Sequence, residues 1–307
     1  MTEPTIAGEP DIDTDRRQEL ATRLEQRLRE VTERDAYDSG LGAAMNPTPK
    51  TTHQQSHIER TPHARTRRDR PPSRPFIRVP SREMGMRIAL LGGTGDIGEG
   101  LALRFGRDTN HELLIGSRDP EKARDAVAEY KTTLEDHTDS VDIKGFANEM
   151  AADRADIVVC SVPPYHVGDT VEGVADSLDS DTVLVTPAVG MKGDADGLHY
   201  HPPSAGSVTE LVAERAPDEV PVVGAFHNLA AGALADLETD LDLDTLVVAD
   251  DEAARDTVLN LAGELEGLRA LAAGPLANAA EVESVTPLVI NIAKYNDDMH
   301  DVGVKWV

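Results

Sequence analysis

The stretch Met86-Arg-Ile-Ala-Leu-Leu-Gly-Gly-Thr-Gly-Asp-Ile-Gly98 decides the fold. Its apolar half predicts a buried strand that runs directly into a glycine-rich turn, and a helical pattern over residues 99–107 follows. Strand, turn and helix in this order form the site where a dinucleotide pyrophosphate meets the N–H groups of a helix start. Gly93 permits the sharp turn, Gly95 leaves room for the phosphates, and Gly98 permits close packing of the helix on the strand. An ordinary strand–helix turn is the alternative that the motif alone leaves open.

The end of the next apolar run, residues 111–116, indicates which dinucleotide binds. An NAD site carries an Asp or Glu there for the ribose 2′-hydroxyl, whereas an NADP site carries groups that bind a phosphate. Here the strand ends at Ser117 and Arg118, with Lys122 one helical turn further on. A hydroxyl, a guanidinium fork and an ammonium can each bind a 2′-phosphate. The sequence therefore favours NADP over NAD, the alternative being a solvated loop with ordinary surface charges.

Further along the chain, short apolar runs alternate with helical patterns, which predicts an α/β fold. We expect a Rossmann-like, doubly wound and mostly parallel sheet with a smaller C-terminal part. The expected strands cover residues 87–91, 112–115, 141–143, 156–161, 182–186 and 221–225, followed by two more near 246–249 and 268–272. The NADP-binding Rossmann domain is expected over residues 86–228, and a C-terminal α/β and helical segment over residues 229–307.

Residues 1–85 have a different composition, rich in Pro, Thr, His and Arg in their second half, and predict a disordered extension. Met84 and Met86 stand directly before the first strand, so a start codon assigned too far upstream would explain this segment. The chain begins without the apolar core of a signal peptide, and it contains no apolar run of about 20 residues. We therefore expect a cytoplasmic protein that does not enter a membrane.

The negative charge is concentrated in the part that is expected to fold. Residues 1–85 carry 15 basic and 14 acidic side chains, whereas residues 86–307 carry 15 and 42. Such a domain repels itself in dilute buffer, but at 1 M salt the Debye length falls to about 3 Å. Only seven of the 30 basic residues are Lys, and we interpret this composition as that of a protein from a salt-adapted cytosol, the alternative being a merely soluble acidic protein.

The acidic surface also excludes nucleic acid as a ligand of the folded domain. It gives weight to the few cations near the glycine loop, because an anionic cofactor must be held somewhere; these are Arg104, Arg107, Arg118 and Lys122. The single cysteine, Cys160, lies in an apolar run and is expected to be a buried core thiol. Because the chain has no HExxH or CxxC pattern, no metal site is expected.

Five short segments, taken together and in this order, resemble one family. They are Gly-Gly-Thr-Gly-Asp-Ile-Gly (92–98), Gly-Ser-Arg (116–118) with Lys122, Val-Pro-Pro (162–164), Ala-Phe-His-Asn (225–228), and Gly-Pro-Leu (274–276) with Glu283 and Thr286-Pro287-Leu288. The set is similar to coenzyme F420-dependent NADP reductases, the reduced-F420:NADP oxidoreductases of archaea and some actinobacteria. The resemblance covers residues 86–294 and spares the first 85.

The resemblance implies direct hydride exchange between a deazaflavin, coenzyme F420, and the nicotinamide of NADP. It implies that NADP is held by Thr94, Gly95, Asp96, Ile97, Ser117, Arg118 and Lys122, to which the glycine motif itself adds Gly93 and Gly98. It places the meeting point of the two rings near Val162, Pro163, His227 and Asn228. It also implies a homodimer, for which the apolar run 285–293 offers an interface, although core burial explains that run equally well.

A hydride passes between two rings without a general base, so no catalytic residue is expected, and the protein orients the rings. We expect His227 to donate to a ring carbonyl or a phosphate, the alternative being a core histidine tied to a backbone carbonyl. A second interpretation is an NADP-dependent reductase of a small ketone, imine or hydroxy acid, with Lys192 or Tyr200 as acid. A third is a non-catalytic NADP-binding sensor whose Arg-rich tail docks a partner.

Overall fold

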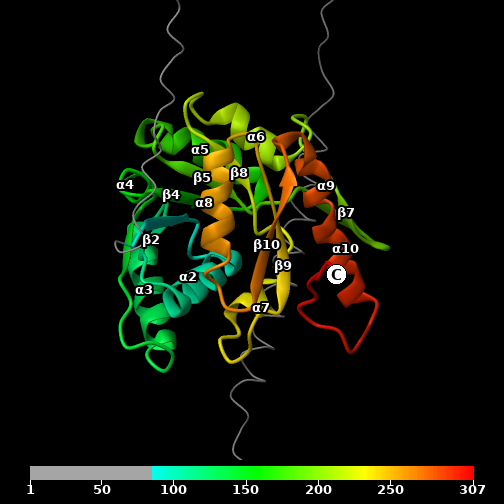
Figure 1. Ribbon diagram of the computed structural model, residues 1–307, viewed down its shortest axis with the longest axis horizontal. Coiled ribbons are helices and arrows are strands. Elements are labelled where there is room, and N and C mark those ends of the chain that lie inside the picture. Colours follow the sequence, from blue (N-terminus) through cyan, green and yellow to red (C-terminus); the bar gives the residue numbers. More distant parts are fainter. Residues whose placement is uncertain (1–84) are drawn as a thin grey trace, which may run out of the picture.

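The computed structural model describes residues 85–307, in which helices cover an eight-stranded sheet (Figure 1). The expected N-terminal extension lies, apart from Gly85, outside the described residues. The strand order is β10-β9-β8-β5-β4-β1-β2-β3. These strands are β1 (Arg87–Leu91), β2 (Glu112–Ser117), β3 (Ile143–Ala147), β4 (Ile157–Cys160), β5 (Val183–Thr186), β8 (Val222–Gly224), β9 (Leu243–Ala249) and β10 (Leu268–Gly274).

Helices pack on both faces of this sheet. One face carries α2 (Asp96–Asp108), α3 (Pro120–Leu134), α7 (Ala231–Ala235) and α8 (Glu252–Ala262). The other face carries α4 (Asn148–Ala152), α5 (Pro164–Val174) and α6 (Val208–Arg215), while α9 (Ala279–Glu283) and α10 (Val285–Lys294) follow β10. Within residues 85–307, every helix is too short or too polar to span a bilayer.

The first strand shows why the sheet is buried on both sides. Ile88 and Leu90 belong to the apolar cluster on one face, whereas Ala89 and Leu91 belong to the cluster on the other. Side chains alternate between the faces of a strand, so a strand covered on both sides reads as a continuous apolar run. This is the pattern from which the parallel sheet was predicted, and the α/β class and the mostly parallel sheet are confirmed.

The direction of the strands changes once in this sheet. β8 pairs with β9 in antiparallel fashion, and every other pairing of the sheet is parallel. β1 lies between β2 and β4, so the chain winds outward from β1 in both directions. In such sheets, ligands bind beyond the carboxyl ends of the strands, at the point where the winding reverses.

A short hairpin of β6 (Met191–Asp194) and β7 (Gly197–Tyr200) lies outside the main sheet. The sequence pattern does not predict it, because these residues are mostly polar and half exposed. The register pairs Asp194 with Gly197, so Ala195 and Asp196 form the two-residue turn, and Gly197 closes it with a φ of +140°. The amide of Asn291 in α10 binds both the N–H and the carbonyl of Leu198, which fastens the hairpin to that helix.

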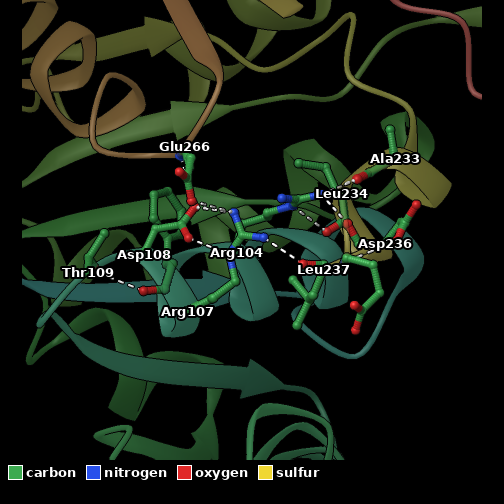
Figure 2. Close-up of polar contacts among 11 residues, drawn as sticks. Arg104, Arg107, Asp108, Thr109, Ala233, Leu234, Asp236, Leu237 and Glu266 are labelled. Carbon is green, nitrogen blue, oxygen red and sulfur yellow. Dashed lines mark hydrogen bonds and ion pairs between the residues drawn. The ribbon is translucent and has the colours of Figure 1, made fainter. Parts of the chain in front are cut away.

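Arg104 in the middle of α2 joins the C-terminal segment to the sheet (Figure 2). Its fully buried guanidinium donates to the carbonyl oxygens of Leu234 at 3.0 Å, Ala233 at 2.7 Å and Asp236. These carbonyls lie at the C-terminal end of α7, where backbone acceptors lack helical partners and a cation is favoured. Arg107 donates in the same way to the carbonyl of Leu237.

The expectation that Arg104 and Arg107 are cations available to an anionic cofactor is therefore wrong. Both guanidinium groups are occupied by α7 and the loop that follows it (Figure 2). The residues sit on the predicted helix, but their partners are about 130 positions away in the chain. A local pattern gives no signal for such a contact.

We predict that Arg104→Met lowers the free energy of unfolding by about 3 kcal/mol, because buried carbonyls lose a charged donor. The matched control is Arg215→Met, which removes a half-exposed ion pair with Glu172 and should cost less than about 1 kcal/mol. Urea unfolding of both variants in molar KCl measures the difference. Equal losses in the two variants would contradict the role of Arg104.

Candidate functional site

The loop after β1 is closed so tightly that two of its positions accept glycine only. A Cβ at Gly93 would lie 2.7 Å from the carbonyl oxygen of Leu90, and one at Gly98 would lie 2.6 Å from the Cα of Gly93. α2 therefore starts directly against the end of β1, and its N-cap, Gly95, has no side chain. Among the described residues no N-cap side chain bonds to this helix start, and the positive end of the helix dipole favours an anion there. The two glycines therefore bring the start of α2 to the carboxyl end of β1, where a pyrophosphate would bind.

The remaining loop residues surround the helix start, with Thr94 exposed and Asp96 and Ile97 half-buried. Two side chains outside the motif hold the loop. The Tyr130 hydroxyl of α3 donates to the carbonyl of Gly93 at 2.7 Å, and the Ser161 hydroxyl donates to that of Leu91 at 2.9 Å. Sequence reasoning misses Tyr130 as a loop support, because it falls on the buried stripe of α3 and so predicts a core residue.

The end of β2 lies beside the glycine loop and presents free cations. The N–H groups of Gly92 and Gly93 both donate to the carbonyl of Gly116, at 3.1 and 3.2 Å. Ser117 follows, buried, and its hydroxyl accepts from the N–H of Asp119 at 3.2 Å.

Arg118 and Lys122 are exposed, and within residues 85–307 neither forms an ion pair. Asp119, the nearest carboxylate, is committed to capping α3 through the N–H of Glu121. A hydroxyl and two unpaired cations thus stand at the predicted 2′-phosphate position.

Asn148, which sequence reasoning does not single out, lies next to this position. It is the first residue after β3, and the register pairs the preceding Ala147 with Ser117. A Cβ at Gly116 would lie 2.8 Å from Asn148 Oδ1, so the glycine makes room for the amide. Oδ1 is buried and has no hydrogen-bond partner among the described residues. The sequence offers no periodic or motif signal for this contact.

The end of β4 brings Val162 and Pro163 to the glycine loop. The N–H of Ser161 donates to the carbonyl of Leu91 at 2.9 Å, and a Cβ at Gly92 would lie 2.6 Å from Val162 Cγ1. Pro163 is exposed and precedes α5 as its N-cap. Val162 therefore packs against the glycine loop, and Pro163 follows it at the start of α5.

Asn228 lies after β8, but its side chain is directed into the protein. Its Nδ2 donates to the carbonyl of Asp244 at 2.7 Å, and its Oδ1 accepts from the Thr245 hydroxyl at 3.3 Å. The side chain is only 2 % exposed. Both ends of the amide thus join the end of β8 to β9, where the strand direction reverses.

His227 is also buried, with 3 % of its surface exposed. Its Nε2 lies 3.3 Å from the Thr209 hydroxyl, and its Nδ1 has no partner among residues 85–307. Burial lowers the pKa of His227 to about 3, so the ring is neutral near pH 7. Its own carbonyl accepts from the Thr286 hydroxyl at 2.8 Å.

Glu283 of α9 binds the start of α6 with a fully buried carboxylate. It accepts from the N–H groups of Val208 and Thr209, at 3.0 and 2.9 Å, from the Thr209 hydroxyl at 2.9 Å and from the Tyr200 hydroxyl at 3.1 Å. Burial raises the pKa of Glu283, while the four donors and the positive end of the helix oppose that shift. Sequence reasoning places Glu283 only in a family motif and gives it no role.

The remaining candidates are not arranged for proton transfer. The Tyr200 hydroxyl is engaged by Glu283, and burial beside that carboxylate raises its pKa. Lys192 is exposed on the hairpin. Cys160 is buried as predicted, and burial raises the pKa of its thiol to about 12. Over residues 85–307, no three His, Cys, Asp or Glu side chains come together as a metal site.

Comparisons with known proteins agree with this geometry. The family described as "NADP oxidoreductase coenzyme F420-dependent" matches residues 87–190. The F420-dependent NADP reductase of Methanocaldococcus jannaschii is 37 % identical over 209 residues, which cover 67 % of this chain and 92 % of that protein. The enzyme of the same name from Methanothermobacter thermautotrophicus is 37 % identical over 212 residues, covering 68 % and 90 %.

A solved structure shares the fold. It is a crystal structure of a protein assigned as an F420-dependent NADP reductase from Arthrobacter sp. FB24, with a TM-score of 0.57 and 24 % identity. The match covers 68 % of this chain and 94 % of that one. The identity and coverage of the two archaeal relatives show that this chain belongs to the F420-dependent NADP reductase family.

Proposed function

We propose that the protein transfers a hydride between reduced coenzyme F420 and NADP at the carboxyl edge of its sheet. Membership of the reductase family supports the reaction. The observation that carries the choice of NADP is that Arg118 and Lys122, beside Ser117 and the glycine loop, are exposed and form no ion pair within residues 85–307. In a chain with a net charge of −26, two free cations at this position are selective for a phosphate.

On the NADP side, the pyrophosphate would meet the helix start, and the 2′-phosphate would meet the end of β2. The residues assigned to this side are Gly93, Thr94, Gly95, Asp96, Ile97, Gly98, Ser117, Arg118 and Lys122. Tyr130 and Ser161 support the loop from behind without touching the cofactor. We propose residues 86–228 as the NADP-binding unit and residues 229–307 as the second segment, because the strand direction reverses after residue 228.

When bound, the reduced deazaflavin would supply a hydride to the nicotinamide, and the ring proton that its oxidation releases would leave to solvent. The chain's own residues then have to orient two rings and exclude water. Val162 and Pro163 provide an apolar wall next to the dinucleotide loop. Both ends of the buried Asn228 amide are engaged, so we assign Asn228 to shaping this place from below. We assign His227, whose Nδ1 has no partner among the described residues, to the floor of this place.

The alternative reductase of a ketone, imine or hydroxy acid needs an acid in the cleft. Tyr200 gives its proton to a hydrogen bond with Glu283, and Lys192 is on the exposed hairpin. Neither arrangement favours that reaction. A non-catalytic sensor would share the NADP site and differ only in turnover.

We further propose that the protein works as a homodimer in the cytoplasm of a halophilic archaeon. The 42 acidic against 15 basic side chains of residues 86–307 suit a salt-rich cytosol. For the dimer, the support is the apolar surface of α10 and the tail that follows it. Leu288, Tyr295 and Met299 are exposed there, Leu288 to 57 %.

The full chain, mixed with NADPH and oxidised F420 in molar KCl, is expected to bleach the visible band of the deazaflavin. The rate should fall as KCl is lowered, because charge repulsion returns. Absorbance of the deazaflavin and fluorescence of bound NADPH measure turnover and binding separately. An intact deazaflavin band together with bound NADPH would reject the reductase and support the sensor.

Arg118→Ala is expected to weaken NADPH binding by about 1.5–3 kcal/mol, the scale of a charged hydrogen bond, and to leave NADH binding unchanged. The matched control is Arg124→Ala, which removes the same charge from an exposed position on α3, the helix that follows Arg118. Dissociation constants for both nucleotides, at one salt concentration, give the comparison. Equal losses for NADPH and NADH would contradict the 2′-phosphate assignment.

Leu288→Asp is expected to convert a dimer into a monomer, because it places a charge in the apolar contact. Light scattering coupled to gel filtration measures the mass, and Thr257→Asp on the exposed surface of α8 is the control. A wild-type monomer, or a dimer that survives Leu288→Asp, would remove α10 as the interface.

A further inference from the structure

Three buried side chains form a hydrogen-bonded row that ends behind the proposed meeting place of the rings. Glu283 belongs to α9, Thr209 to α6, and His227 follows β8. Thr209 Oγ1 lies 2.9 Å from Glu283 Oε1 and 3.3 Å from His227 Nε2. Each of the three is less than 5 % exposed.

The carboxylate decides the direction of the first hydrogen bond. Each of its oxygens faces two donors: Oε1 faces the N–H and the hydroxyl of Thr209, and Oε2 faces the N–H of Val208 and the hydroxyl of Tyr200. An ionised carboxylate only accepts, and four donors leave no place for a proton on it. The Thr209 proton therefore points toward Glu283.

The direction of the second hydrogen bond follows from the first. Because its proton is committed to Glu283, the Thr209 oxygen can only accept from His227. His227 Nε2 therefore carries the ring proton, and Nδ1 keeps a lone pair. Among the described residues, nothing accepts a second proton from Nδ1, so the ring has no partner for the charged form. This direction contradicts the expectation that His227 donates to a cofactor, because the Nε2–H group already donates to Thr209.

We propose that Glu283 is a positioning residue for hydride transfer. Acting through Thr209, it holds His227 as the neutral Nε2–H tautomer, which leaves Nδ1 as an acceptor for an amide N–H. Deazaflavin and nicotinamide each carry such an N–H, in the ring imide and in the carboxamide. This inference rests on the proposed function, which places the end of β8 behind the rings.

The sharpest comparison is Thr209→Val against Thr209→Ser. Valine keeps the shape and the backbone N–H bonds to Glu283 but removes the hydroxyl that links to His227, whereas serine keeps it. Long-range proton–nitrogen NMR of the histidine rings, with His227→Gln to identify the signal, reports which nitrogen carries the proton. We expect Nε2–H in the wild type and in Thr209→Ser, and a mixture of tautomers in Thr209→Val.

Turnover gives the second readout. Thr209→Val is expected to lower kcat by up to about 100-fold, the scale of a misplaced active-site group, whereas Thr209→Ser should stay close to the wild type. A rise in KM for F420 alone or for NADPH alone shows which cofactor supplies the N–H. If Thr209→Val does not fold, Glu283→Gln takes its place. When the glutamine NH2 group faces Thr209, it donates to the Thr209 hydroxyl, and the hydroxyl proton then turns toward His227.

Two results would overturn the proposal. One is an Nδ1–H tautomer in the wild-type protein. The other is a variant whose tautomer changes while kcat and both KM values stay the same, since Glu283 would then be structural only. The NMR result does not depend on turnover, so a wild-type protein that fails to bleach F420 refutes the proposed function and leaves the tautomer assignment standing.

Discussion

The close approach of α2 to the end of β1 is the constraint on which the site depends. At Gly93 and Gly98, the backbone of the loop and the helix occupies the space that side chains would need. This contact places the positive end of α2 at the carboxyl edge of the sheet, beside the end of β2. The hydroxyls of Tyr130 and Ser161 reach the carbonyls of Gly93 and Leu91 because the loop is closed in this way.

The same helix also fastens the rest of the molecule. Its first turn faces the predicted cofactor, while Arg104 and Arg107, further along, bind the carbonyls of α7 and of the loop after it. α7 follows directly on His227 and Asn228. A displacement of α2 would therefore move the glycine loop and the segment after β8 together.

The sequence predicts correctly the features of the fold that depend on residues close together in the chain. The glycine loop, the apolar strands and the alternation of strands with helices are short-range features, and they led to the α/β class and the parallel sheet. The sequence does not predict the hairpin at Met191–Tyr200, because its strands lack a continuous apolar run. The contacts of Arg104 and of Glu283 join residues 74 to 132 positions apart, for which a single sequence holds no signal.

The buried thiol of Cys160 makes opening of the sheet measurable by alkylation. It is the single cysteine of the chain, and it lies on β4, paired with Leu91 of β1 in the middle of the sheet. A thiolate reacts with alkylating agents, whereas this thiol is closed from solvent and stays protonated. Alkylation therefore has to wait until β4 separates from its neighbours, and its rate counts how often the nucleotide-binding half of the sheet opens.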